Sequence, residues 1–172
     1  MKIRSFSHVG LTVSDFGRAV KWYYDMFGFR LIEERVIGKE QVNSLSGLYG
    51  LHDVDIRLGF LQVPKGGVLE IFEILPSVPA GRTVWNKPGL THFALDVKNV
   101  GKWYKLLQAK GVHFFSEPQK TGGAEWVFME DPDGNLIELI DMKANYIAVR
   151  YFGEIAGKLM SGSKFKKYYS AV

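Results

Sequence analysis

A short pattern occurs twice in this chain, and this repeat constrains the fold more than any other feature. The first copy runs from Ser7 to Val13 and the second from Thr91 to Val97. In both copies a histidine precedes a leucine and a valine at the same spacing, and a glycine and a lysine follow at the same offsets. Side chains alternate between two faces, which predicts a strand. A repeat at this spacing predicts an internal duplication.

The residues after each copy predict the same order of elements, strand–helix–strand–strand–strand. The first helix has an N-cap in Ser14 and Asp15 and a stop at Gly28. In the first module the expected strands are 3–13, 29–37, 54–63 and 67–75, and the helix is 16–27. In the second module they are 91–97, 112–115, 125–130 and 136–141, with a helix at 100–110. The pattern predicts an α+β fold of two tandem βαβββ modules.

The expected domain organisation has four parts. Residues 1–75 form the first module, with an inserted loop and short helix at 38–53, and 76–88 form a Pro- and Gly-rich linker. Residues 89–141 form the second module, and 142–172 form a C-terminal extension. Apolar residues four apart in this extension predict an amphipathic helix that packs on the modules or on a partner subunit. They are Ile147, Tyr151, Ile155 and Leu159.

The composition restricts which chemistry is available. The chain of 172 residues is 47% hydrophobic and contains no cysteine. Disulfides, zinc–thiolate sites, iron–sulfur clusters and a cysteine nucleophile are therefore excluded. A metal ion would need imidazole and carboxylate ligands, which suit zinc, nickel, cobalt, manganese or iron(II).

The charge and hydropathy patterns favour a cytoplasmic protein whose partner is a small molecule. The net charge is +4, and its excess lies late in the chain at Lys158, Lys164, Lys166 and Lys167 rather than along one stripe. We therefore expect a solvated tail and no nucleic-acid partner. No apolar run approaches the roughly 20 residues that cross a bilayer, and the N-terminus leads directly into a predicted strand, so we expect neither membrane insertion nor a signal peptide.

Each module pairs its repeated histidine with a glutamate in its last strand. Glu70 shares a strand face with Val68, Phe72 and Ile74, and Glu138 similarly lies on an apolar face. A carboxylate on an apolar face is costly to bury unless it is paired or bound to a cation. Packed with pseudo-two-fold symmetry, the modules would bring His8, Glu70, His92 and Glu138 together as a metal site.

A structural interpretation of these residues stands beside the metal site. A lone histidine on a strand is more often a hydrogen-bonded structural residue, and a lone glutamate usually faces solvent. Glu73, on the other face of the same strand, competes with Glu70. The repeat-equivalent positions of both histidines and both glutamates favour the metal site.

On these motifs, the chain resembles the vicinal oxygen chelate superfamily, which includes glyoxalase I, epimerases, extradiol dioxygenases and antibiotic-resistance proteins. The resemblance covers roughly residues 5–141, and its most specific pieces are His8 to Asp15, Leu69 to Ile71 and Asp131 to Leu139. It implies a cupped sheet around a divalent metal, with His8, Glu70, His92 and Glu138 as ligands. It also implies a homodimer.

The ligand set is similar to that of bacterial glyoxalase I, which has His, Glu, His and Glu in this order. Extradiol dioxygenases leave the Glu70 position open, epimerases usually have glutamine there, and antibiotic-sequestering members typically lack a complete set. Two positions differ from glyoxalase I. Thr12 stands where that enzyme has a glutathione-binding arginine, and Ile74 where it has an asparagine.

The resemblance implies a metal-dependent isomerase or lyase that abstracts a proton next to a carbonyl, as lactoylglutathione lyase does. Glu138 is the expected base, and Glu70 could serve from the opposite face. An iron(II) ring-cleaving dioxygenase and a non-catalytic binding or resistance protein are the alternatives. The expected walls of the substrate pocket are Phe6, Thr12, Phe72, Phe93 and Trp126.

Overall fold

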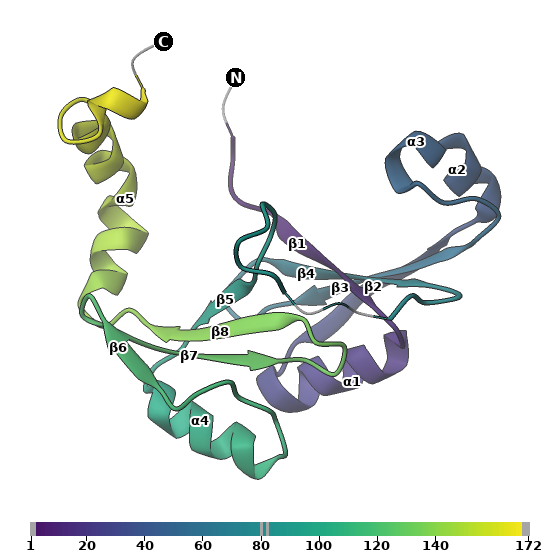
Figure 1. Ribbon diagram of the computed structural model, residues 1–172, viewed down its shortest axis with the longest axis horizontal. Helices are drawn as coiled ribbons and strands as arrows, with labels where there is room; N and C mark the ends of the chain where they lie inside the picture. The colour runs from purple at the N-terminus through teal and green to yellow at the C-terminus, as the bar shows by residue number, and fades with distance from the viewer. Residues whose placement is uncertain (1–2, 80, 82, 170–172) are drawn as a thin grey trace. The chain divides into compact units, whose positions relative to one another are not determined.

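The computed structural model describes residues 3–79, 81 and 83–169. It contains two four-stranded sheets (Figure 1). Each copy of the repeat lies at the first strand, in chain order, of one of these sheets. The first sheet has the strand order β1-β4-β3-β2 and the second has the order β5-β8-β7-β6. The predicted α+β fold of tandem modules is therefore confirmed.

The elements of the first sheet follow the predicted order. The strands are β1 (His8–Val13), β2 (Arg30–Ile37), β3 (Ile56–Gln62) and β4 (Val68–Ile74), and the helix is α1 (Phe16–Phe27). β1 pairs parallel with β4, whereas β3 pairs antiparallel with both β4 and β2. The inserted segment forms two short helices, α2 (Lys39–Ser44) and α3 (Ser46–Tyr49), where the sequence predicted one.

Helix α1 begins and ends where its caps predict. The side chain of Asp15 accepts a hydrogen bond from the backbone N–H of Arg18, and Gly28 adopts a left-handed conformation with φ of 72°. The helix packs on one face of the first sheet (Figure 1). A side chain at Gly59 would meet the ring of Phe16 at 2.5 Å, so the absence of a Cβ there lets the helix approach β3.

The opposite face of the first sheet, defined here as the open face, carries the predicted site residues of this module. Along β1, Leu11 and Val13 are buried, whereas His8, Gly10 and Thr12 are exposed. Leu69 and Ile71 are buried on the core side of β4, whereas the alternate positions of β4 are only half-buried. Those alternate positions are Val68, Glu70, Phe72 and Ile74.

The second sheet also follows the predicted order, with one correction. Its elements are β5 (Phe93–Asp96), α4 (Val100–Ala109), β6 (Gln119–Thr121), β7 (Ala124–Glu130) and β8 (Leu136–Asp141). The strand predicted at 112–115 is wrong. Only one bridge forms there, between Phe114 and Met129, and pairing with β7 resumes at Gln119. The chain bends between these points and contains Pro118, which has no N–H to donate to a ladder.

The C-terminal extension contains the predicted helix, α5 (Asn145–Ser161), followed by the short 3₁₀ helix η1 (Lys166–Tyr168). No side chain of α5 is buried. No helix among the described residues is long and apolar enough to span a bilayer.

The chain divides into two compact units whose boundary differs from that of the sheets. Unit 1 comprises residues 1–93 and 130–137, and unit 2 comprises 94–129 and 138–172. The turn between β7 and β8 therefore belongs with the first sheet and α1. The predicted division at a 76–88 linker stays a prediction.

Candidate metal centre

His8 and Glu70 form the contact that most resembles half of a metal site. The Nε2 atom of His8 lies 3.3 Å from the Oε2 atom of Glu70. Two ligand atoms bound about 2.1 Å from one ion, at tetrahedral or octahedral angles, are about 3.0–3.4 Å apart. The pair therefore fits the spacing of two ligands of the same divalent cation.

The backbone of β1 makes room for this pair. Glu70 lies directly opposite Gly10 in the parallel register, diagonal to His8. A Cβ atom at Gly10 would be 3.1 Å from the Cε2 atom of Phe72 and 3.6 Å from Oε2 of Glu70. Glycine at this position thus lets the Phe72 ring and the Glu70 carboxylate lie over the strand.

Side-chain burial differs between the two partners. The His8 side chain is 45% exposed, whereas that of Glu70 is 13% exposed. The ring of His8 also stacks on Phe60, with centroids 6.4 Å apart. A half-buried carboxylate beside a solvent-accessible imidazole combines a fixed oxygen ligand with access for a metal ion and a substrate.

Both repeated histidines have a hydroxyl group at the same ring nitrogen. The Oγ atom of Ser7 lies 3.0 Å from Nδ1 of His8, and the Oγ1 atom of Thr91 lies 2.9 Å from Nδ1 of His92. Metal-binding histidines usually donate the second ring N–H to a hydrogen-bond acceptor, and a hydroxyl oxygen can serve as one. Such a bond fixes the tautomer with the other nitrogen available to the ion. The two hydroxyl contacts therefore favour Nε2 as the ligating atom in both copies.

His92 belongs to the same unit as His8 and lies just before β5. It is half-buried, and its ring lies 5.7 Å from that of Trp85. With Phe93, Leu11 and residues 133–136, from the β7–β8 turn and the start of β8, it lines a small cavity of about 130 Å³. Glu138 is half-buried in β8 and belongs to unit 2.

The structure brings together His8 and Glu70 of the four predicted ligands. In the part of the chain that the structure describes, no three His, Asp or Glu residues form a cluster that could hold a metal ion. Convergence of His92 and Glu138 with the first pair stays a prediction. The donor set, two imidazoles and two carboxylates, has the chemistry that zinc, nickel, cobalt, manganese and iron(II) accept.

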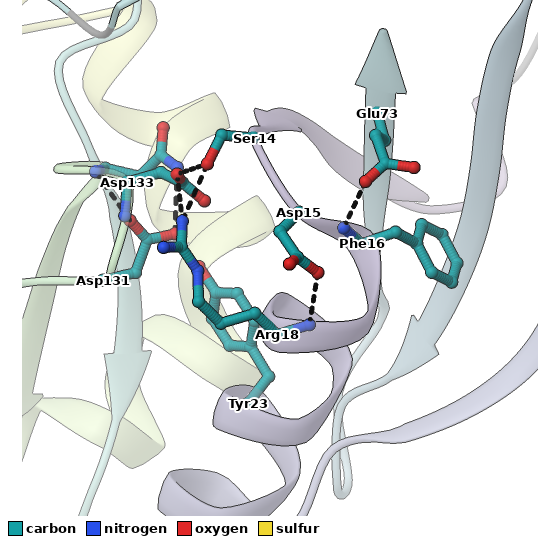
Figure 2. Close-up of polar contacts among 9 residues, drawn as sticks. Ser14, Asp15, Phe16, Arg18, Tyr23, Glu73, Asp131 and Asp133 are labelled. Atoms are coloured by element: carbon teal, nitrogen blue, oxygen red, sulfur yellow. Dashed lines mark hydrogen bonds and ion pairs between the residues drawn. The ribbon is translucent and has the colours of Figure 1, made fainter. Parts of the chain in front are cut away.

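Glu73, the competing carboxylate, has a different role. Its Oε1 atom accepts a hydrogen bond of 2.8 Å from the backbone N–H of Phe16, in the first turn of α1. Its Oε2 atom lies 3.8 Å from the Arg57 guanidinium. Glu73 faces α1, as Figure 2 shows for its contact with Phe16. Glu70 instead faces His8, so the structure separates a helix-capping glutamate from the candidate ligand.

The predicted pocket residues occupy different environments. Phe72 borders Gly10 on the open face, and Thr12 lines a larger cavity where β1 and β4 end. Phe6 precedes β1 and is 80% exposed. Trp126 lies in unit 2 and contacts Phe128 edge-on, with ring centroids 5.5 Å apart. Their contact with a substrate stays a prediction.

A polar network at the start of α1 was missed by the sequence reasoning (Figure 2). Arg18 donates to the Oγ atom of Ser14 and to the Oδ1 atom of Asp133, each at 2.7 Å. The hydroxyl of Ser14 also donates to Asp133. No local sequence pattern indicates this role for Asp133, because its partners lie more than 100 residues earlier in the chain.

The buried side chain of Asp131 stabilises this turn by hydrogen bonds. Only 5% of it is exposed, and it accepts backbone hydrogen bonds from Asp133 and Asn135. The phenol of Tyr23 donates to its Oδ2 atom at 2.8 Å. Burial, followed by the Asp131 charge, raises the pKa of Tyr23 well above its usual value, so the phenol stays protonated. The network ties the β7–β8 turn to α1 inside unit 1.

Comparisons with known proteins give the chain its family. The model of the glyoxalase/bleomycin resistance protein/dioxygenase superfamily matches residues 5–139. A lactoylglutathione lyase of Arabidopsis thaliana is 30% identical over 140 residues, which cover 80% of this chain and 44% of that protein. The chain thus spans less than half the length of this relative. An uncharacterized Bacillus subtilis protein, YwkD, is 26% identical over 82% of this chain and 99% of its own length.

Solved structures show the same fold. A glyoxalase family protein from Bacillus cereus aligns with a TM-score of 0.67 at 18% identity, over 82% of this chain and 95% of that one. The trypanothione-dependent glyoxalase I of Leishmania major aligns with a TM-score of 0.61 at 20% identity, over 95% and 99% of the two chains. With its tandem modules and a family model that spans both sheets, the chain belongs to the glyoxalase/bleomycin resistance protein/dioxygenase superfamily.

Proposed function

We propose that this protein is a divalent-metal-dependent isomerase or lyase of the glyoxalase I or epimerase type. It would abstract a proton from a carbon next to the carbonyl group of a small-molecule substrate. The observation that carries the proposal is the His8–Glu70 contact at 3.3 Å, at the spacing of two ligands of one ion. The relatives named lactoylglutathione lyase support the reaction class.

Four side chains would hold the ion in this proposal. His8 and His92 supply neutral imidazole nitrogens, which their Ser7 and Thr91 partners orient, and Glu70 and Glu138 supply carboxylate oxygens. A divalent ion supplies Lewis acidity, which stabilises the negative charge that develops on a carbonyl oxygen during proton abstraction.

The proton would be taken by a carboxylate of the same set. Glu138 is the proposed base. It is the repeat-equivalent of Glu70 and lies in β8, the last strand of the second module. Glu70 is the alternative base on the opposite face. Both carboxylates are half-buried in their strands.

Elemental analysis followed by an activity screen tests the proposal. We expect a divalent ion in the purified protein or after reconstitution, and turnover of methylglyoxal hemithioacetals formed with several thiols. At a saturating concentration of the metal ion, Glu138→Gln should carry the ion while turnover falls by about 10²–10⁴-fold, the usual contribution of a general base. Glu117→Gln, an exposed change in the same unit, should leave both unchanged. A protein that binds no divalent ion, or a Glu138→Gln variant of full activity, would contradict the proposal.

A further inference from the structure

A cavity of about 530 Å³ opens where β1 and β4 end. This volume is within the roughly 300–1,000 Å³ of small-molecule pockets. Its walls come from both strand ends, the start of α1, the inserted segment, the chain that follows β4 and the β7–β8 turn. The apolar lining includes Leu51, Ile74, Pro76, Val78 and Pro79.

The charges that line this cavity are already paired with each other. Among the residues that the structure describes, Arg18 and Asp133 are its charged lining residues, and they form an ion pair of 2.7 Å. Figure 2 shows this pair with Ser14, whose hydroxyl bonds to both. An incoming charged group would therefore meet a neutral pair and lose hydration without gaining a partner of opposite charge.

The cavity lies along the same strands as the candidate metal ligands. Thr12 is four residues after His8 on the open face, and Ile74 is four residues after Glu70. At about 3.3 Å per residue, the cavity begins about 13 Å along the strands from the His8–Glu70 contact. Both strands run towards the cavity, because β1 and β4 are parallel.

We propose that this cavity binds a neutral, largely apolar arm of the substrate, whose reacting carbonyl lies at His8 and Glu70. The inference rests on the proposed function for the position of the carbonyl, but the chemistry of the arm follows from the cavity itself. Apolar walls favour a hydrocarbon or neutral amide chain, and the hydroxyls of Thr12 and Ser77 accept a neutral polar end. A thiol partner with free carboxylates fits this lining poorly.

Three probes that share an acetamidoalkyl chain and differ in the charge of the terminal group test the cavity directly. They are N-hexylacetamide, 6-acetamidohexanoate and 6-acetamidohexylammonium, titrated into the metal-free protein and followed by NMR shifts of the cavity residues. We expect the neutral probe to bind at least about tenfold more tightly than either charged probe, which corresponds to about 1.4 kcal/mol. Equal or tighter binding of a charged probe would overturn the inference.

Matched variants assign the binding to this cavity. Ile74→Trp fills it and should weaken the neutral probe at least about tenfold. Ile32→Trp makes the same change at an exposed position of β2 outside the cavity and should leave binding unchanged. Thr12→Arg introduces an unpaired cation and should shift preference to the carboxylate probe. Unchanged binding of the neutral probe in Ile74→Trp would refute the site.

The outcomes separate this inference from the proposed function. Probe binding is measured without metal, so a protein that fails to turn over carbonyl substrates can still show the neutral preference. Conversely, rapid metal-dependent turnover of a glutathione hemithioacetal, with slow turnover of the N-acetylcysteamine analogue, would support the proposed function and overturn the neutral arm.

Discussion

Removing the hydroxyl groups next to the two repeated histidines should weaken metal binding without unfolding the chain. Ser7 and Thr91 contact Nδ1 of His8 and His92 at 3.0 and 2.9 Å. A neutral hydrogen bond of this length contributes about 0.5–1.5 kcal/mol, which is roughly a 2–12-fold change in affinity. The Ser7 bond is exposed and should lie at the low end, whereas the Thr91 bond is partly buried and should lie at the high end.

The double variant Ser7→Ala, Thr91→Val should therefore bind a divalent ion about 10–100-fold more weakly, the range seen when the partners of metal-binding histidines are removed. Calorimetric titration with Zn²⁺ and the absorption spectrum of a Co²⁺-loaded sample measure the effect. Ser7→Thr and Thr91→Ser keep each hydroxyl and should retain affinity. Ser5→Ala, at an exposed position, is the control. A double variant within twofold of the parent affinity would refute the role of these hydroxyls.

Two further predictions concern packing and pH. In Gly10→Ala the new Cβ atom would lie 3.1 Å from Cε2 of Phe72, so the ring should move, displace the Glu70 carboxylate and lower metal affinity several-fold. Gly47→Ala places its Cβ atom in open space and should leave affinity unchanged in the same titration. Because the pKa of Tyr23 is raised in the folded state, its contribution to the free energy of unfolding is complete below pH 10 and falls above it by about 1.4 kcal/mol per pH unit. Denaturant titrations should show a shallower decline above pH 10 for Tyr23→Phe than for the parent. Equal slopes would refute the prediction.

Local sequence patterns were sufficient for most elements of the fold. Helix α1 was predicted from Phe16 to Phe27 because an Asp15 cap and a Gly28 stop act within a few residues of its ends. Strand β8 was predicted to the residue for the same reason, since the Gly134 turn immediately precedes it. The prediction of a strand at 112–115 was wrong, because strand formation there depends on pairing with β7 rather than on the local sequence pattern.

Part of the candidate site could likewise be predicted from local sequence patterns, and part could not. Alternation along the two predicted strands assigned His8 and Glu70 each to a face of its own strand, and the structure brings the two side chains into contact. The roles of Glu73 and Arg18 could not be predicted, because the first caps a helix 57 residues away and the second pairs with a turn 115 residues away. Such long-range contacts leave no periodic signal in a single sequence.

The central claim is that Glu70, and not Glu73, joins His8 in holding a divalent ion. The two glutamates lie three residues apart in β4 and face opposite sides of the sheet. The most direct test is a Zn²⁺ titration of Glu70→Gln and Glu73→Gln beside the parent protein. We expect Glu70→Gln to lose most of the affinity and Glu73→Gln to retain it, because the amide oxygen of the new side chain can still accept the Phe16 N–H. Retained affinity in Glu70→Gln, or loss confined to Glu73→Gln, would contradict the assignment of Glu70 as a ligand.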